Sequence, residues 1–492
     1  MLRGSGWQLI ATGSNTFGQI AVAVVLARLL TPADFGLVAV GFATTEMIGV
    51  IAEYGAAAAV ARQHPPTSAL VRRALARTAG LGLAGTIAAI GLGLVVERWL
   101  GMAQLMSIVV ALTAGGALAS LGQVLQAIAE ANLDFRRIAI VDVASYWIGA
   151  LVFSVPLAFL RFGPWALVIG FAAQALVRVV AHGPLLRTLV PAPWDETNAR
   201  SFASFGGYVT LGRLVNVGVN QVDKLILGRR GGATLVGLYS RPMLLVVQMS
   251  TAVGTIYDRV LYPVFGRLSA SSPTLLVDHF LRATAFIGVA LTPAAFFVAA
   301  EAPRLVLLVF GSQWATGAGV LRWGAIALPA LAIIRVCDTL MRAVGQPVRS
   351  IRLKSVYLLA LLPAVLVGTV FGATGVAFAV FVVACVMAAL HLLDAVAAAG
   401  GSTVDFWHLL SRCAPVTVML AVGVTASTNV LAVIWPDTGV LGLVLAAAAA
   451  VCASAGAVYV DSRIGTRALR WIVAPFFDRL PSLARRVLGE EV

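Results

Sequence analysis

Residues 352–397 read RLKSVYLLALLPAVLVGTVFGATGVAFAVFVVACVMAALHLLDAVA, two long apolar runs joined at Phe371-Gly372-Ala373-Thr374-Gly375. A helix that crosses the roughly 30 Å hydrocarbon core of a bilayer needs about 20 apolar residues, and each run supplies them. The two glycines at the junction interrupt the helix. The stretch therefore predicts two membrane-spanning helices joined by a tight turn.

The same pattern extends along the whole chain. Of the 492 residues, 60% are hydrophobic and 11% are charged, and the mean hydropathy is +0.95. Soluble domains carry about 25% charged residues, so this composition excludes a soluble or a disordered protein. The runs are continuously apolar rather than alternating, which disfavours an outer-membrane barrel. The sequence predicts an all-α polytopic membrane protein.

Fourteen apolar runs are candidate transmembrane helices. Their cores lie at 6–29, 35–60, 74–96, 102–127, 138–160, 164–187, 204–228, 234–263, 282–300, 318–341, 352–371, 374–397, 409–434 and 438–460. The first run has no small-residue cleavage site, so we expect a retained span rather than a signal peptide. The loops between the runs are short and leave no room for a catalytic domain.

The basic residues predict the orientation. The net charge is +14, and with the N-terminus inside, Lys and Arg favour the inner loops by about three to one. An even number of spans places both termini in the cytoplasm. We therefore expect a multi-pass protein of a bacterial cytoplasmic (inner) membrane.

Residue matches at constant offsets indicate an internal repeat. At an offset of 201 residues the pairs are Asn15/Asn216, Leu26/Leu227, Arg28/Arg229 and Gly36-Leu37/Gly237-Leu238, and at 209 the pair is Phe162-Gly163/Phe371-Gly372. Both offsets correspond to a shift of six spans. Two six-helix lobes related by a pseudo-two-fold axis along the membrane normal are expected, plus two extra helices. The predicted parts are a first lobe at 1–200, a second lobe at 201–400, two further helices at 401–462 and a tail at 463–492.

The tail differs from the rest of the chain in its pattern. Residues 463–492 alternate basic residues with large apolar ones, as in Arg470-Trp471-Ile472-Val473. Such a basic amphipathic segment is typical of binding to the anionic cytoplasmic leaflet, and docking of a partner is the alternative.

Polar residues recur at helical spacing inside four of the predicted spans, two from each half. Ionisable side chains are costly in lipid and mark either pairs or a water-filled cavity. The candidates are Asn15 and Gln19 in the first span, Glu46 and Glu53 in the second, Arg213, Asn216 and Asn220 in the seventh, and Arg241 and Gln248 in the eighth.

These candidates suit different roles. Arg213 lies about 15 Å into its span, too deep to reach the interface easily, so we expect it to face a cavity. Arg241 is the second candidate of this kind. Glu46 either pairs with one of these arginines or titrates. Asp223 and Lys224 lie near the outer end of their span, where simple solvation is sufficient.

Enzymatic and metal chemistry are poorly supported by the sequence. The five histidines are scattered, with no His-x-x-x-His pair, and the four cysteines have no metal-ligand spacing. No Walker-type glycine loop is present. We expect no cofactor, no metal and no enzymatic activity, and energy for any transport would come from a gradient or from the substrate.

Several short motifs are spread along the chain. They are Arg28-Leu29-Leu30-Thr31-Pro32-Ala33-Asp34-Phe35-Gly36-Leu37-Val38-Ala39, Leu133-Asp134-Phe135-Arg136-Arg137, Asn220-Gln221-Val222-Asp223-Lys224, Gly237-Leu238-Tyr239, Asp258-Arg259-Val260-Leu261-Tyr262-Pro263-Val264-Phe265 and Phe310-Gly311-Ser312-Gln313-Trp314. In their order and spacing these motifs resemble one family, that of the bacterial polysaccharide exporters or oligosaccharide flippases of the multidrug/oligosaccharidyl-lipid/polysaccharide exporter superfamily. The resemblance covers roughly residues 5–400.

The resemblance implies two six-helix lobes around a central cavity and transport of a polyprenyl-pyrophosphate-linked oligosaccharide to the outer leaflet by alternating access. It also implies a monomer. Guanidinium groups offer a bidentate fork to phosphate oxygens, so we assign Arg213 and Arg241 to the pyrophosphate. The Asn and Gln side chains named above are assigned to the sugar, and Glu46 and Glu53 to coupling or charge pairing.

Two other functions stay open at this stage. A drug or cation antiporter of the same superfamily would use the acidic residues, although buried positive charge favours an anionic substrate. A membrane scaffold for glycan assembly would act through the tail. The expected partners are the lipid-linked oligosaccharide, membrane lipids and other polysaccharide assembly proteins, with no nucleic acid.

Overall fold

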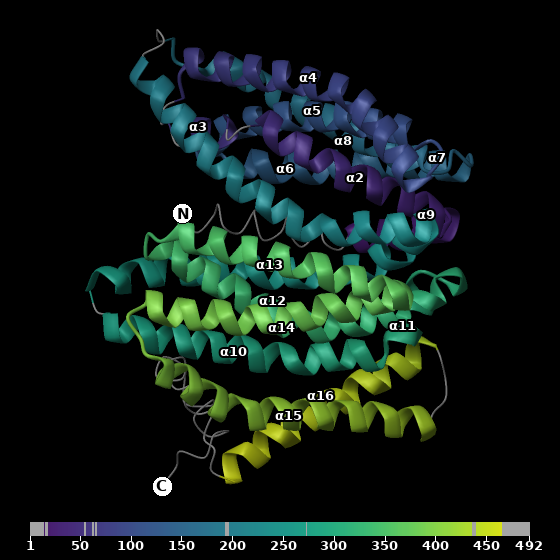
Figure 1. Cartoon of the computed structure of the whole chain (residues 1–492), viewed down its shortest axis with the longest axis vertical. Coiled ribbons are helices and arrows are strands. Elements are labelled where there is room, and N and C mark those ends of the chain that lie inside the picture. The colour runs from purple at the N-terminus through teal and green to yellow at the C-terminus, as the bar shows by residue number, and fades with distance from the viewer. Residues whose placement is uncertain are drawn as a thin grey trace. The chain divides into compact units, whose positions relative to one another are not determined.

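A computed structural model describes residues 14, 18–53, 56–61, 63, 66–191, 196–271, 273–434 and 439–464. In these ranges the chain is helical, with one isolated β-bridge between Thr67 and Val190. After a helix at Gly18–Leu29, the elements are α2 (Pro32–Glu53), α3 (Ala56–Ala61), α4 (Ser68–Leu100), α5 (Leu105–Ala131), α6 (Phe135–Trp147), η1 (Ile148–Ser154), α7 (Val155–Phe159), α8 (Trp165–His182), η2 (Gly183–Thr188), α9 (Glu196–Ser271), α10 (Pro273–Ala300), α11 (Ala302–Val309), η3 (Ser312–Gly317), α12 (Ala318–Ala343), α13 (Pro347–Gly368), η4 (Thr369–Phe371), α14 (Gly372–Ala398), α15 (Thr403–Ile434) and α16 (Val440–Ile464). The predicted all-α fold class is confirmed for the described chain (Figure 1).

Within the described residues, each predicted span overlaps one or more helices. Ten of the described segments are long and apolar enough to cross a membrane, and one of them, Pro347–Ala398, contains both α13 and α14. The shorter Gly18–Leu29 belongs to the first predicted span, and α9 contains the seventh and eighth. The protein is therefore a multi-span membrane protein.

The chain divides into two compact units. Unit 1 comprises Met1–Arg241 and Leu361–Val376, and unit 2 comprises Pro242–Ala360 and Ala377–Val492. In unit 1, α5 packs against α2, α4 and α8, which lie side by side with it in Figure 1. In unit 2, α10 packs against α12 and α15. Each unit thus has its own helix-on-helix core.

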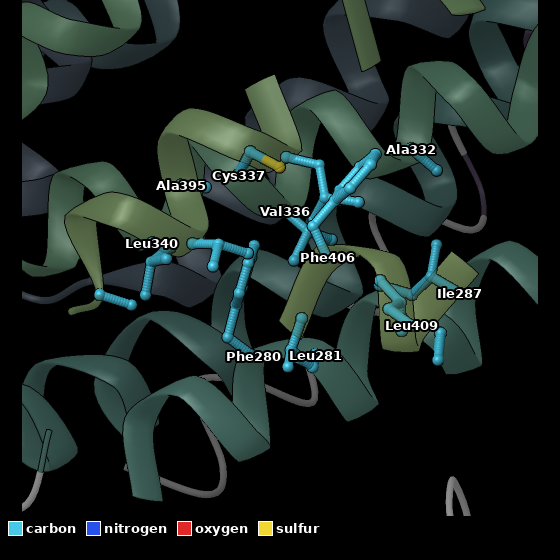
Figure 2. Packing of buried hydrophobic residues seen from close by; sticks show 14 of the residues in the cluster. Phe280, Leu281, Ile287, Ala332, Val336, Cys337, Leu340, Ala395, Phe406 and Leu409 are labelled. Atoms are coloured by element: carbon cyan, nitrogen blue, oxygen red, sulfur yellow. The ribbon is translucent and has the colours of Figure 1, made fainter. Parts of the chain in front are cut away.

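An apolar cluster lies in the core of unit 2. Phe280 of α10, Val336 and Leu340 of α12, Ala395 of α14 and Phe406 of α15 converge on one another and are buried (Figure 2). Membrane helices associate through such close packing, because lipid is as apolar as the side chains themselves. The cluster fixes the ends of α12 and α14 that carry the charged residues considered below.

Local chemistry explains where the helices begin. The Thr31 hydroxyl and amide both donate to a carboxylate oxygen of Asp34, at 2.7 and 2.9 Å, and Pro32 occupies the first helical position of α2. This is a capping box, which satisfies donors that a helix N-terminus leaves free. The turns before α8 and α14 use Gly163 and Gly372, with φ of +57° and +69°. These glycines form the pair predicted at an offset of 209 residues.

Two departures from simple periodicity have local causes. Gly232, with φ of +68° and ψ of −174°, divides α9 into a first arm at 196–231 and a second arm at 233–271. The fifth predicted span is broken by a π-helix, Ile148–Ser154. Pro156 follows it and lacks the amide hydrogen that an α-helix requires. Ser154 also packs directly on Gly170 of α8.

Candidate functional site

The first arm of α9 carries a polar face in an otherwise apolar chain. Arg213, Asn216 and Asn220 lie at spacings of three and four residues, and all three side chains are exposed. The Asn220 side-chain amide donates to the Asn216 carbonyl oxygen at 2.8 Å. One helix face therefore presents a guanidinium and two amides, as the sequence predicts.

A hydrogen-bonded chain of three side chains connects this arm to α2. The Lys224 ammonium donates to the Gln221 side-chain oxygen at 2.5 Å, and the Gln221 amide donates to the Glu46 carboxylate. Gln221 thus lies between a cation and an anion and is oriented by both. The partner that the structure gives to Glu46 is this amide, which the sequence analysis did not consider.

Asp223 has a different role from the one expected for it. Its side chain is only 8% exposed, so the expectation of a solvated residue is wrong. The Tyr239 hydroxyl of the second arm donates to it at 2.5 Å, and the Lys224 amide donates at 2.8 Å. The hydrogen bond between Tyr239 and Asp223 joins the two arms of α9 near Gly232. It also links the Asn220–Lys224 motif to the Gly237–Tyr239 motif.

Arg241 is held by an aromatic ring. Its guanidinium carbon lies 3.7 Å from the centroid of the Phe35 ring, and Phe35 is fully buried. A guanidinium stacked on a ring face keeps its charge and its donors at the edges. The Arg241 side chain is half-buried, so part of it faces away from protein.

The two arginines lie at different depths. Arg213 precedes the turn residue Gly232 by 232 − 213 = 19 residues, and Arg241 follows it by 241 − 232 = 9. At 1.5 Å per residue these separations are about 28 Å and about 14 Å along the two arms. The two guanidinium groups therefore differ by about 14 Å in their distance from the turn at Gly232.

The first helix–turn–helix and the one at Gly232 meet in a reciprocal contact. A Cβ placed on Gly36 would overlap the carbonyl oxygen of Ala233, and one placed on Gly237 would overlap that of Pro32. The 201-residue offset converts one contact into the other, because Pro32 corresponds to Ala233 and Gly36 corresponds to Gly237. A local two-fold relation predicts such an exchange of contacts, which supports the internal repeat.

The remaining predicted site residues are Gln19, Gln248, Glu53 and Asn15. Gln19 and Gln248 are half-buried in the helices predicted for them. Glu53 is the last residue of α2, and its side chain, like all of Asn15, lies outside the described residues. Among the described residues, no group of three or more His, Cys, Asp or Glu could hold a metal ion.

Sequence reasoning missed the neighbours of the charged groups. Gln221, Tyr239 and Phe35 all lie within the motifs that carry the resemblance, and only Gln221 lies beside a named candidate. Aromatic residues near an intramembrane charge are a usable signal, since a ring or a phenol can satisfy a buried ion without a counter-ion.

The fold and this polar face define a class: a multi-span membrane protein that is helical throughout its described residues and exposes polar side chains on one helix face. Residues 25–318 match the family model described as polysaccharide biosynthesis protein, and the chain belongs to this family.

The chain can be aligned with two characteristic relatives over similar lengths. The chain is 23% identical over 355 residues to the lipopolysaccharide biosynthesis protein WzxC of Escherichia coli (strain K12), covering 71% of this chain and 69% of that protein. It is 26% identical over 360 residues to the succinoglycan biosynthesis transport protein ExoT of Rhizobium meliloti (strain 1021), covering 70% and 69%.

Solved structures share the fold. The lipid II flippase MurJ in an inward closed conformation superposes with a TM-score of 0.68 at 10% identity, covering 94% of this chain and 99% of that one. A MATE transporter of Vibrio cholerae, VcmN, gives 0.53 at 15% identity, covering 82% and 97%. The predicted exporter-superfamily fold is thereby confirmed.

Proposed function

We propose that the chain is a flippase that moves a polyprenyl-pyrophosphate-linked oligosaccharide from the inner to the outer leaflet of a bacterial cytoplasmic membrane by alternating access. The family, and the transport role after which the relative ExoT is named, support a function in surface polysaccharide synthesis. The fold shared with a lipid II flippase supports a lipid-linked substrate.

The observation that carries the proposal is the exposed polar face of the first arm of α9. Lipid would not tolerate Arg213, Asn216 and Asn220 on one helix face, so this face lines a hydrated path. A pyrophosphate that leaves water needs cationic donors, and a sugar needs neutral donors and acceptors. The face offers both kinds within two helical turns.

Arg241 would serve the pyrophosphate at a second depth. Its guanidinium lies on the Phe35 ring, and the N–H groups at its edge can donate a bidentate pair of hydrogen bonds to phosphate oxygens. Asn15, Gln19 and Gln248 would extend the sugar-binding surface. Glu46 accepts a hydrogen bond from Gln221, which in turn accepts one from Lys224, so a cation lies near this carboxylate and reduces its repulsion of an anionic substrate.

Further parts of the proposal follow from this activity. The protein acts without enzymatic chemistry or a cofactor, as a monomer with both termini in the cytoplasm. It works beside other polysaccharide assembly proteins, and its tail at 463–492 rests on the inner leaflet. The two lobes divide near residue 200, and the two helices at 401–462 lie outside the repeat.

The test is transport by purified protein in liposomes that contain a fluorescent prenyl-pyrophosphate glycan. Arg213→Ala is expected to lower the initial rate at least tenfold at equal protein content, and Arg213→Lys to recover part of it, because an ammonium keeps the charge but loses the fork. Arg98→Ala is the matched control, since Arg98 is an exposed arginine in the last turn of a different helix, α4.

Normal transport by a well-folded Arg213→Ala protein would refute the assignment of this side chain. Transport of a cationic dye, but not of the glycan, would instead identify the drug or cation antiporter. Binding of the glycan with no movement would identify the scaffold.

A further inference from the structure

Two ion pairs lie at the end of unit 2 that we predict to be cytoplasmic. Arg342 of α12 pairs with Asp258 of α9 at 2.9 Å, and Lys354 of α13 pairs with Asp338 of α12 at 2.9 Å. Ser350 donates to the other oxygen of Asp338. In both pairs one cation meets one carboxylate within hydrogen-bond distance, so neither pair needs a further ion.

Arg349 and Arg352 of α13, which lies beside α14 in Figure 1, lack such a pairing. Nη1 of Arg349 and Nη2 of Arg352 each lie 3.8 Å from the same atom, Oδ1 of Asp394 in α14. An N–H···O hydrogen bond spans about 2.7–3.2 Å, so neither approach is a hydrogen bond. Nη1 of Arg349 is buried and has no hydrogen-bond partner in the described part of the chain. Two cations therefore share one carboxylate and have donors left over.

The two guanidinium groups can reach one ligand. They lie three residues apart on a helix, where the Cβ atoms are about 5–6 Å from each other. The side chains of Arg349 and Arg352 are 39% and 68% exposed. A guanidinium presents its N–H groups as a planar fork that matches the oxygens of a phosphate. A phosphodiester carries one negative charge, which equals the excess of two cations over one carboxylate.

The helix face that carries Arg352 continues as an apolar surface. Val356 and Leu359 follow Arg352 by four and seven residues, and they are 43% and 66% exposed. These spacings place the three side chains on one side of α13. Exposed aliphatic side chains of a membrane-spanning helix contact lipid chains, which are equally apolar. An arginine at the end of such a face reaches the depth of the lipid headgroups.

The positive-inside rule accounts for basic residues at this end of the chain, but not for the pattern of their partners. The first half of the chain provides a comparison in α6, which lies six predicted spans before α13. Near the start of α6, Arg137 donates to the carbonyl oxygen of Ala181 at 2.7 Å. That guanidinium is satisfied within the protein, whereas Arg349 keeps a buried donor that an external anion can accept from.

We propose that Arg349 and Arg352 bind the phosphate of an anionic phospholipid of the inner leaflet, with its acyl chains along Val356 and Leu359. The phosphate oxygens accept hydrogen bonds from both guanidinium groups, including Nη1 of Arg349. Asp394 is the anion that competes with the phosphate for these two groups. The leaflet follows from the orientation predicted above, and the site does not depend on the transport activity.

A phospholipid fits this site better than the other phosphates a membrane protein meets. A soluble phosphate would gain nothing from the apolar face that begins one turn beyond Arg352. A prenyl pyrophosphate carries a second negative charge, which the two arginines would have to balance while Asp394 remains beside them. The single charge of a phosphodiester and its attached acyl chains match both parts of the site.

The first experiment is native mass spectrometry of the purified full-length protein, titrated with phosphatidylglycerol and separately with phosphatidylcholine. The unmodified chain should bind phosphatidylglycerol more tightly, because choline carries a cation that neutralises its own phosphate. Arg352→Gln should raise the dissociation constant of phosphatidylglycerol about tenfold, since it removes charge-assisted hydrogen bonds.

Arg342→Gln is the matched control for this measurement. It removes the same charge from an exposed arginine at the same end of unit 2, but that arginine already donates to Asp258. Its dissociation constant should stay within about twofold of that of the unmodified chain, as expected for a screened surface charge. Equal effects of Arg352→Gln and Arg342→Gln would overturn the proposal, and so would equal binding of the two lipids by the unmodified chain.

A second variant should change the affinity in the opposite direction. Asp394→Asn keeps the size of the side chain and removes the competing charge, so the dissociation constant of phosphatidylglycerol should fall by about threefold. A misfolded protein would not bind the lipid more tightly, so this variant decides the question if Arg352→Gln fails to fold. Unchanged or weaker binding by Asp394→Asn would contradict the proposal.

Competition distinguishes the sources of the phosphate. Glycerophosphate has the charged group but no acyl chains, and at equal concentration it should not displace phosphatidylglycerol. Displacement would assign the site to a soluble phosphate and overturn the lipid assignment. Displacement by a prenyl pyrophosphate at a lower concentration than phosphatidylglycerol itself requires would assign the site to the lipid-linked substrate, and it would also overturn the proposal.

Discussion

Replacement of Gly36 by alanine should weaken the contact between α2 and the second arm of α9. The new Cβ would lie 2.5 Å from the carbonyl carbon of Ala233, and closer still to its oxygen. Carbon atoms pack best at about 3.5–4.0 Å, so the two backbones must separate by about 1 Å. The obstacle is backbone rather than a flexible side chain, so the strain cannot be relieved by a rotamer change.

The expected change in the free energy of unfolding has two parts. Overpacking of this kind costs about 1–3 kcal/mol, and we expect the upper end. Alanine in a helix interior regains up to about 1 kcal/mol over glycine. Gly36→Ala should therefore destabilise the protein by about 2 kcal/mol. Gly49→Ala in the same helix meets no atom within 4 Å and should stabilise it by up to about 1 kcal/mol.

The internal repeat provides an equivalent second variant, Gly237→Ala. A Cβ on Gly237 would lie 2.7 Å from the carbonyl carbon of Pro32, in the same interface. Once Gly36→Ala has separated the helices, Gly237→Ala should cost less than it does alone, so the two effects should not add. The assay is the melting temperature in nanodiscs of fixed lipid composition. A Gly36→Ala protein that melts no lower than Gly49→Ala would refute the packing argument, and strict additivity would refute the shared interface.

Two further outcomes can be checked in the same preparations. Tyr239→Phe removes a hydrogen bond to the buried carboxylate of Asp223 and should cost about 1.5–3 kcal/mol, measured as a lower melting temperature, and no loss would mean that another donor replaces the phenol. Single cysteines at Phe162 and Phe371, both exposed, should react with a membrane-impermeant reagent from outside, and one at Val348 only after the membrane is opened. Labelling of the opposite set would reverse the orientation.

The helices were predictable because lipid imposes one rule along the whole chain. Apolar runs of about 20 residues and the Gly or Pro residues between them suffice to place the spans, and Gly163 and Gly372 occur at the predicted turns. The π-helix at Ile148–Ser154 was not predictable, because it depends on Pro156 together with the close approach of Gly170. The periodicity of the sequence predicts which face of a helix is apolar, but it does not predict such local packing.

The site was predictable only as a set of side chains on one face. The spacing of Arg213, Asn216 and Asn220 follows from the helix itself. The partners of the charges do not, since Gln221 meets Glu46 across 175 residues of sequence and Arg241 meets Phe35 through tertiary packing. The roles of these side chains in binding stay predictions.

The exchange of contacts between Pro32 and Gly237, and between Ala233 and Gly36, has a consequence for how such a chain can arise. In a dimer of two identical half-length proteins these two contacts would be one contact, generated twice by symmetry. A half with an even number of spans inserts in the same direction as its copy, so fusion of the two genes preserves the interface without any change in topology. After fusion the copies are free to differ. The capping box of Thr31 and Asp34 has no counterpart at Gly232 and Leu235, which occupy the equivalent positions of the second copy. Fusion of the halves would thus have allowed one copy to lose a local stabilising device that the other kept.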